Sequence, residues 1–548
     1  MDYQKLANLL FKEELKSPEE YEEIYPTRDL NKKASVTRLG PSPTGFIHVG
    51  NLYGALVDKL EAKKNNGVMF LRIEDTDRTR YVEGAEELII NSLKHFEIEF
   101  DEGVTLIGDF GDYGPYRQSE RVSIYHTFAK KLVENGRAYP SFESEKEIEE
   151  IRNRQIELSI ETGIYGEWAR HRELSLEEVD ERLAGGEDYV LRLKSEGNKE
   201  NSVKIVDAIR GELIFPENFQ DIVLLKSDGV PTYHFAHVVD DHLMRTTHVI
   251  RGEEWLSTLA VHLELFKALG WRPPTYCHTA HLMKMDGDKK RKLSKRLDPE
   301  LSLEYYMELG YFPEAMLEYL MTLINSDFEE WRRNNPDKSI YDFPFTLKKM
   351  GKSGALFDLK KLEDVSKDTL SRLSDQRIYD FLLEWARAYE PEFAKLMEDD
   401  ENFIKLIGIG RNRKKPRKDL AYARQIFEYM NFYFDDYYKV YDRLPENVNK
   451  EDAVKFLEEY LKTYESSSDN NEWFDKVKAI SEPMGYATNM KEYKENPDKF
   501  KGSVSDLCNV IRLTMNGRLE SADLCDIGKV MGDERVRDRI EKFINTIK

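Results

Sequence analysis

Residues 35–77 read SVTRLGPSPTGFIHVGNLYGALVDKLEAKKNNGVMFLRIEDTD, and this stretch decides the fold. Its start, Ser35–Leu39, is rich in β-prone residues, and a loop of Gly, Pro, Ser and Thr follows as far as Gly45. Residues 52–60 carry leucines at helical spacing, and Val68–Ile73 is a second apolar run. The order of strand, loop, helix and strand predicts a parallel crossover unit.

The loop in this unit has the chemistry of a nucleotide site. A Gly-rich turn that leads into a helix presents free backbone N–H groups and a positive dipole end to a phosphate. The sequence matches neither GxGxxG nor GxxxxGK[ST]; instead His48 lies at the predicted helix start, and Gly50 would let a nucleotide approach the backbone. Because a lone histidine at a helix start is usually structural, this interpretation depends on the rest of the chain.

Composition limits the class of protein. A length of 548 residues predicts three or four domains, and a hydrophobic content of 40% is enough for sizeable cores. The sequence has no run of 18 apolar residues and no signal-like start, so we expect neither a membrane span nor secretion. The three cysteines form no CxxC pair, which favours a reducing cytosol and argues against a disulfide framework. With a net charge of −21, an RNA ligand would need local basic patches.

Five motifs in order make the chain recognisable. TRLGPSPTGFIHVGN resembles the HIGH-type signature of class I aminoacyl-tRNA synthetases, in the form used by bacterial-type glutamyl-tRNA synthetases. The other four are similar to motifs of the same family: LRIEDTDR at 71–78, GPYRQSER at 114–121, VIRGEEWL at 249–256, and KLSKR at 292–296, a variant of KMSKS. The resemblance is strong from about residue 36 to 358 and continues more weakly to the C-terminus.

The resemblance implies an α/β fold with several attached parts. We expect a Rossmann-like parallel-sheet catalytic domain, an inserted α+β domain for the tRNA acceptor end, a helical connector and an all-α anticodon-binding domain. The expected ranges are an N-terminal extension at 1–34, the first catalytic half at 35–113, the insertion at 114–230, the second catalytic half with the KLSKR loop at 231–297, the connector at 298–375 and the anticodon-binding domain at 376–548.

For ATP, the resemblance implies catalytic roles for His48, Lys292 and Lys295. Lys295 should contact the triphosphate most directly, and the whole expected ATP set is Thr44, Gly45, His48, Gly50, Asn51, Lys292, Ser294 and Lys295. Adenylate formation needs positioned positive charge around the phosphates. Mg²⁺ should accompany ATP without a dedicated protein cage. Some relatives hold zinc in the insertion, but this chain has YPSFE at 139–143 instead of a cysteine cluster, so we expect no zinc.

The amino-acid pocket must bind two carboxylates and an ammonium group. By resemblance, Arg38 takes the side-chain carboxylate, Arg251 takes the α-carboxylate and Glu74 takes the ammonium, with Ser42 and Tyr233 completing the wall. Arginine suits carboxylates because its planar fork donates two parallel hydrogen bonds. From the residues alone, Arg38 and Glu74 could instead form an internal ion pair. A further residue, His237, could either shape the pocket or fill the core.

The clearest basic patch is RNRKKPRK at 411–418, which is followed by several aromatic residues. Single-stranded RNA loops are bound by cations and stacked rings, so we expect tRNA contact near the anticodon. The expected tRNA-binding residues are Arg411, Arg413, Lys414, Lys415 and Arg417. A solvated linker followed by a core helix is the alternative.

The sequence therefore predicts a cytoplasmic glutamate–tRNA ligase that uses L-glutamate, ATP and tRNA(Glu) and acts as a monomer. One alternative is a non-discriminating or glutaminyl enzyme. Another, of a different class, is an inactive paralogue that binds tRNA, although the motif residues argue against it.

Overall fold

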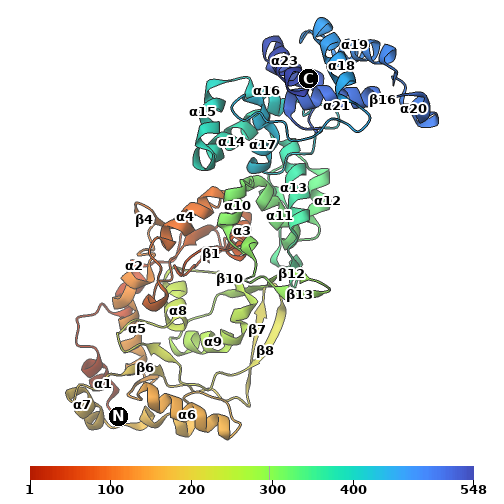
Figure 1. Cartoon of the computed structure of the whole chain (residues 1–548). Helices are drawn as coiled ribbons and strands as arrows, with labels where there is room; N and C mark the ends of the chain where they lie inside the picture. Colours follow the sequence, from red (N-terminus) through yellow and green to blue (C-terminus); the bar gives the residue numbers. More distant parts are fainter. Residues whose placement is uncertain (295–296) are drawn as a thin grey trace. The chain divides into compact units, whose positions relative to one another are not determined.

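The computed structural model describes residues 1–294 and 297–548, while Lys295 and Arg296 lie outside the described residues. The chain forms two compact units (Figure 1). Unit 1 comprises Met1–Tyr305 and Leu320–Asp358, and unit 2 comprises Tyr306–Tyr319 and Leu359–Lys548. Each unit has its own hydrophobic core.

A parallel sheet forms the centre of unit 1. Its first strands are β1 (Val36–Leu39), β2 (Val68–Leu71), β3 (Glu102–Thr105) and β4 (Gly108–Phe110). The first three pair in parallel in that order, and β4 returns antiparallel to β3. Helix α3 (Val49–Lys64) connects β1 to β2, and α4 (Ala85–His95) precedes β3. The crossover unit predicted from residues 35–77 is confirmed.

A second, two-stranded parallel sheet lies beside β1. Its strands and the helices around them are α8 (Tyr233–Leu243), β10 (His248–Gly252), α9 (Leu259–Ala268) and β11 (Thr275–Thr279). Strands β10 and β11 are parallel. The Thr247 N–H donates to the Val36 carbonyl at 2.9 Å, which sets β10 alongside β1 although about two hundred residues separate them in sequence.

Between the two halves, the chain forms a mixed region of helices and antiparallel strands. The helices are α5 (Val122–Glu134), α6 (Glu145–Glu157) and α7 (Leu176–Ala184). The strands are β5 (Ala138–Ser141), β6 (Val190–Leu193), β7 (Ser202–Asp207), β8 (Gly211–Pro216) and β9 (Val223–Leu225). Strands β5, β6 and β9 form one antiparallel sheet, and β7 and β8 form a separate hairpin.

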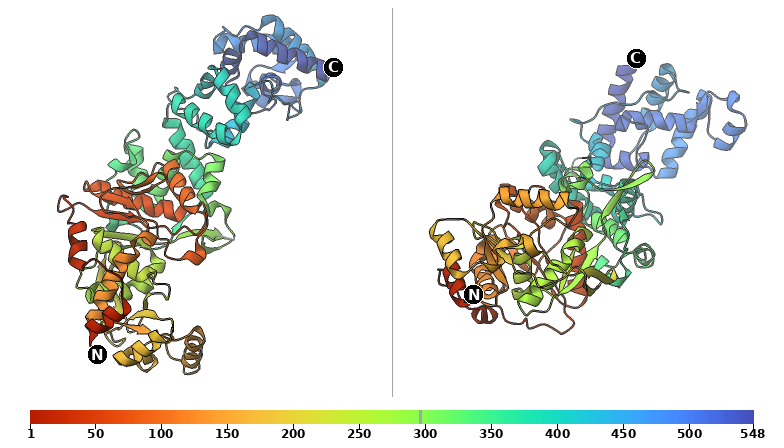
Figure 2. Two further views of the ribbon diagram at one scale, coloured as in Figure 1. Left: turned by 90° about the vertical axis from the view of Figure 1, so that its left-hand side faces the viewer. Right: turned by 90° about the horizontal axis from the view of Figure 1, so that it is seen from below.

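The first 34 residues are part of the core of unit 1. They form α1 (Tyr3–Leu10) and α2 (Pro18–Ile24), and Leu6, Ala7 and Tyr21 are buried. Arg28 makes two hydrogen bonds to the Glu102 carboxylate and lies over the Tyr113 ring. Helix α1 packs against α5 and α7, and Figure 2 marks the amino terminus beside this part of unit 1. This segment therefore packs into the core of unit 1.

Unit 1 ends in a small sheet and short helices. These are β12 (Leu282–Asp286), β13 (Lys289–Lys292), β14 (Ala355–Leu356) and α12 (Phe328–Asn334). Helices α10 (Leu303–Leu309) and α11 (Pro313–Ile324) carry residues of both units. β12 pairs antiparallel with β13 and parallel with β14.

Unit 2 is built of helices, most of which pack on one continuous core. They are α13 (Leu359–Arg372), α14 (Asp375–Tyr389), α15 (Pro391–Asp399), α16 (Phe403–Gly408), α17 (Ala423–Met430), α18 (Lys450–Thr463), α19 (Asn470–Ser481), α20 (Met490–Glu495), α21 (Val504–Asn516), α22 (Leu524–Met531) and α23 (Asp533–Ile547). The strands described in this unit are the two-residue pair β15 (Tyr486–Ala487) and β16 (Gly502–Ser503). The predicted class, α/β with a parallel sheet followed by helices, is confirmed. No helix among the described residues is long and apolar enough to cross a membrane.

Candidate active site

Two predicted substrate-binding arginines lie close together because their strands are neighbours. Arg38 is on β1 and Arg251 is on β10, each near the carboxyl end of its strand. The Nη1 atom of Arg38 lies 3.5 Å from the carbonyl oxygen of Ile250, the residue before Arg251. Both side chains are buried. In open parallel sheets this edge is where ligands bind.

The ion pair considered between Arg38 and Glu74 is not formed. Glu74 instead accepts from Arg72 Nη2 at 2.9 Å, and Arg38 Nε lies 3.3 Å from an Asp241 oxygen. Arg72 Nη1 also donates to Asp241, at 2.9 Å. Burial alone would raise the pKa of the Asp241 carboxyl, but the two arginines and His237 hold it well below its usual range. Asp241 on α8 therefore fixes two guanidinium groups.

Arg251 has only neutral hydrogen-bond partners. Its Nε donates to His278 Nε2 at 3.0 Å, its Nη1 lies 3.2 Å from His262 Nδ1, and its Nη2 lies 3.5 Å from the Trp255 carbonyl. Burial lowers the pKa of both histidines, so both rings stay neutral near pH 7. No carboxylate among the described residues forms an ion pair with Arg251. A buried cation with neutral partners is costly unless a ligand supplies the anion.

Tyr233 and His237 stack on one face of α8. Their ring centroids are 5.7 Å apart with an interplanar angle of 12°. His237 Nδ1 lies 2.7 Å from Asp241, and its Nε2 lies 3.2 Å from the Tyr276 hydroxyl. Burial lowers the pKa of His237 to about 4, more than Asp241 raises it. His237 is therefore a neutral, fully buried residue behind Tyr233, and it cannot supply a charge to the pocket near pH 7.

His48 begins α3 as its N-cap. Its Nδ1 accepts from the Asn51 backbone N–H at 3.2 Å, and the Asn51 side chain accepts from the His48 N–H at 3.1 Å. This reciprocal capping box satisfies two helix-end donors. Because Nδ1 is the acceptor, the proton of the neutral ring is on Nε2, which is the form that can donate to a phosphate oxygen.

Gly50 makes room for the His48 ring. A Cβ atom at Gly50 would lie 2.9 Å from His48 Nδ1 and 3.0 Å from Cε1. Glycine at this position therefore leaves room for the histidine ring. Its place in the sequence had also suggested that a nucleotide approaches the backbone here.

We expect Gly50→Ala to lower the rate of glutamate-dependent ATP–pyrophosphate exchange by about 10–100-fold, because the displaced ring is misaligned. Thermal stability should change little, since alanine favours a helix over glycine by about 1 kcal/mol and offsets part of the clash. Gly54→Ala on the same helix is the matched control, because a Cβ there meets open space. Equal exchange rates in the two variants would contradict the role of Gly50.

The loop between β1 and α3 is partly open to solvent. Ser42 and Thr44 are exposed, and the Thr44 N–H donates to the Ser42 carbonyl at 2.8 Å. Gly45 has φ of +123°, a conformation that favours glycine. The predicted ATP residues of this loop thus lie on one short turn before His48.

The KLSKR segment begins at Lys292, the last residue of β13. Lys292 is exposed and Ser294 is half-buried, whereas Lys295 lies outside the described residues. The Ser294 N–H donates to Asp298 at 2.8 Å, and Arg291 makes two hydrogen bonds to the same carboxylate. These contacts hold the pKa of Asp298 well below its usual range, although burial opposes the shift. Asp298 therefore anchors the base of the loop.

Sequence reasoning missed three of these residues, namely Arg72, Asp241 and Asp298. The available signal was a pair of acidic residues, Asp240 and Asp241, within the stretch 235–243, whose other residues are apolar or histidine. Buried carboxylates need partners, so this pair could have indicated nearby arginines.

The basic segment in unit 2 is less uniform than its sequence suggests. Arg411 is buried, and it donates to Asp375 at 2.7 Å and to the Leu370 and Leu373 carbonyls at the end of α13. The prediction that Arg411 binds tRNA is therefore corrected, because its donors are engaged inside the unit. Arg413 pairs with Asp526 at 3.1 Å and Arg417 with Asp419 at 2.6 Å. Lys414 and Lys415 are exposed.

The aromatic residues after this segment mostly belong to the core. Four of them have exposed fractions of 9% or less: Phe427, Phe432, Tyr433 and Phe434. Phe427 is on α17 and the other three lie on the turn that follows it. These four rings are part of the core, and a buried ring cannot stack on an RNA base.

Within the described part of the chain, no group of three or more His, Cys, Asp or Glu is arranged to hold a metal ion.

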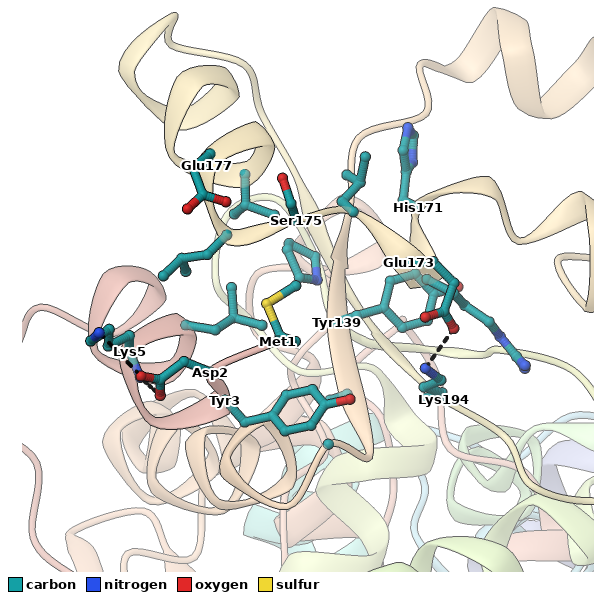
Figure 3. A pocket seen from close by; sticks show the side chains of 18 residues that line it. Met1, Asp2, Tyr3, Lys5, Tyr139, His171, Glu173, Ser175, Glu177 and Lys194 are labelled. Atoms are coloured by element: carbon teal, nitrogen blue, oxygen red, sulfur yellow. Dashed lines mark hydrogen bonds and ion pairs between the residues drawn. The ribbon is translucent and has the colours of Figure 1, made fainter.

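A cavity of about 520 Å³, lined by none of the predicted site residues, lies between the amino terminus, β5 and the start of α7 (Figure 3). Its polar lining includes Lys5, His171 and a Glu173–Lys194 ion pair.

Comparison with known proteins defines the class. Residues 35–364 match the family model described as tRNA synthetases class I (E and Q), catalytic domain. This range contains the buried arginines, the His48 cap and the segment up to Asp298, so unit 1 carries a class I synthetase catalytic domain.

Relatives of full length narrow the class. The chain is 57% identical over 546 residues to a glutamate–tRNA ligase of Acetivibrio thermocellus, covering 99% of this chain and 100% of that protein. It is 46% identical over 553 residues to one of Clostridium perfringens, with the same coverage. A glutamate tRNA ligase from Elizabethkingia meningosepticum, solved in complex with its amino acid, matches with a TM-score of 0.74 and 30% identity over 94% of this chain and 100% of that chain. The chain belongs to the glutamate–tRNA ligase family.

Proposed function

We propose that the chain charges tRNA(Glu) with L-glutamate in two steps. The glutamate α-carboxylate attacks the α-phosphorus of ATP, forming glutamyl-adenylate and releasing pyrophosphate. The terminal adenosine of the tRNA then attacks the adenylate carbonyl, so that the ester bond forms and AMP leaves. The family relatives support the overall reaction, and the proposal adds roles for residues of this chain.

The observation that carries the proposal is the buried Arg251 with neutral partners only. A glutamate α-carboxylate would supply the missing anion, and the guanidinium would hold it toward ATP. Arg38, on the adjacent strand, then faces the side-chain carboxylate. Glu74 faces the ammonium group, with Ser42 and Tyr233 forming the wall. Two arginines on neighbouring strand ends suit a substrate that carries two carboxylates.

Around ATP, the proposed roles are those of a charge-stabilising site. His48 donates from Nε2 to a phosphate oxygen, and the Thr44–Asn51 segment supplies backbone N–H groups. Lys292 and Lys295 neutralise the charge that develops as pyrophosphate leaves, and Ser294 helps to hold their loop. Mg²⁺ arrives with ATP and supplies further charge neutralisation on the phosphates.

For tRNA, we propose that residues 114–230 hold the acceptor end, 298–375 contact the stem and 376–548 approach the anticodon. The ranges 1–34, 35–113 and 231–297 then form the extension and the two catalytic halves. We further propose that the enzyme acts as a monomer in the cytoplasm, without zinc, and that bound tRNA is needed for glutamate activation.

The test is ATP–pyrophosphate exchange with glutamate or glutamine, each with and without tRNA(Glu). We expect exchange with glutamate, dependent on tRNA, and little with glutamine. Absence of exchange with either amino acid in the presence of tRNA would indicate an inactive paralogue instead.

Within the basic segment, the exposed lysines should carry the tRNA contact. We expect the double substitution Lys414→Ala and Lys415→Ala to weaken tRNA(Glu) binding and to reduce the salt slope of log K by up to about 2, because fewer counterions are released. The glutamate KM should be unchanged. Filter binding at several salt concentrations measures both quantities, and the exposed pair Lys32→Ala and Lys33→Ala is the matched control. Equal affinity and slope in both double variants would show that the segment is only solvated surface.

Arg411 should behave differently from its neighbours. Arg411→Gln removes a buried ion pair and two bonds to helix-end carbonyls, so we expect a loss of about 3 kcal/mol in the stability of unit 2. The urea midpoint of the unfolding transition measures this loss, and the lysine double variant should keep the wild-type midpoint. A wild-type midpoint for Arg411→Gln would contradict the structural role.

A further inference from the structure

A chain of hydrogen bonds links Arg251 to the β7–β8 hairpin, far away in sequence. Arg251 Nε donates to His278 Nε2 at 3.0 Å, and His278 Nδ1 lies 2.7 Å from an Asp207 oxygen. His278 is on β11 and Asp207 ends β7, and both residues are buried. Since Nε2 accepts from arginine, the ring proton is on Nδ1, where it donates to the carboxylate.

The Asp207 carboxylate is itself held firmly. Its Oδ1 accepts from the backbone N–H groups of Ile209 and Arg210 at 2.9 and 2.8 Å, and its Oδ2 also accepts from the His278 N–H at 3.0 Å. The hairpin turn is tied to β11 as well, because the Ala208 N–H donates to the Tyr276 carbonyl at 2.9 Å. Figure 1 shows β7 and β8 in yellow. The carboxylate therefore has a fixed direction toward the imidazole.

From this geometry we infer that Asp207 and His278 are positioning residues for glutamate binding. Asp207 selects the tautomer of His278, and His278 in turn orients the Arg251 fork toward the substrate α-carboxylate. The inference rests on the proposed function of Arg251. It gives the β7–β8 hairpin, which belongs to the range expected to bind tRNA, a second task in shaping the amino-acid pocket.

The direct test is Asp207→Asn. The asparagine Oδ1 can keep the two turn hydrogen bonds, but its NH₂ group cannot accept from the His278 backbone N–H. The NH₂ group would donate to His278 Nδ1 and move the ring proton to Nε2, facing the Arg251 N–H. We expect the glutamate KM in pyrophosphate exchange to rise by about 10–100-fold, the range for losing a hydrogen bond to a charged group. The KM for ATP should remain at the wild-type value.

A second readout separates positioning from general damage. Glutamol, in which CH₂OH replaces the α-carboxylate, should inhibit Asp207→Asn and the wild type almost equally, because it makes no ion pair with Arg251. His278→Gln should raise the glutamate KM less than His278→Phe, since only glutamine keeps an acceptor for Arg251. His126→Gln removes another histidine paired with a carboxylate, Glu13, and serves as the matched control.

The inference is overturned if Asp207→Asn weakens the binding of glutamol and of glutamate by the same factor, or if its glutamate KM stays at the wild-type value. It is also overturned if the two His278 variants are equal. A wild-type protein that does not exchange pyrophosphate with glutamate would instead refute the proposed function itself, so the two failures are distinguishable.

Discussion

Arg38→Gln should raise the glutamate KM steeply and narrow the preference for glutamate over glutamine by about 10³-fold or more. The two amino acids have nearly the same shape, so the pocket cannot separate them by size. A guanidinium makes two charge-assisted bonds to a carboxylate, whereas a carboxamide offers one neutral acceptor oxygen and an NH₂ group that faces the guanidinium N–H donors. A site that binds a polar group of its substrate can discriminate against an analogue that lacks this group by a factor of roughly 10⁴ or more in kcat/KM. Pyrophosphate exchange with each amino acid measures the ratio.

The control for this experiment is Arg28→Gln. Arg28 is also a buried arginine bound to a carboxylate, Glu102, so its loss reports the general cost of removing such a pair. If Arg38→Gln keeps the wild-type ratio of glutamate to glutamine activation, Arg38 does not read the side chain. His237 could not replace it, because burial lowers its pKa to about 4 and leaves it neutral. Arg72 would then be the next residue to test.

Lys295→Ala should lower the rate of adenylate formation by about 10²–10³, the scale for losing one charge-stabilising donor at a transition state. The affinity for tRNA should change little, since one lysine contributes a small share of the counterion release. Single-turnover formation of glutamyl-adenylate measures the step directly. Lys290→Ala, an exposed lysine on β13 in the same basic run, is the matched control. A near-normal rate for Lys295→Ala would show that the KLSKR loop does not stabilise the ATP phosphates during adenylate formation.

Much of the site could be predicted because its residues are tied to element ends. Local patterns predicted a short strand that carries Arg38, a helix that starts at His48 and a second strand that ends at Arg251. The roles of these residues came from the family resemblance, and the structure shows that the two strands are neighbours. The secondary structure around them needed no long-range information.

The partners of these residues could not be predicted in the same way. Glu74 could pair with Arg72 or with Arg38. It pairs with Arg72, and Arg38 contacts Asp241, which is on α8 about two hundred residues further along the chain than Arg38. The same holds for Arg411, whose burial follows from carbonyls at the end of α13, about forty residues before it. A run of cations in sequence indicates charge, but not which of its members face solvent.

The central claim is that this chain attaches glutamate to tRNA. The most direct measurement incubates the wild-type protein with ATP, labelled glutamate or labelled glutamine, and purified glutamate or glutamine tRNA side by side. We predict that labelled glutamate becomes acid-precipitable on tRNA(Glu), in an ATP-dependent manner, and that labelled glutamine is not attached to either tRNA. Attachment of glutamine, or of no amino acid to either tRNA, would contradict the account.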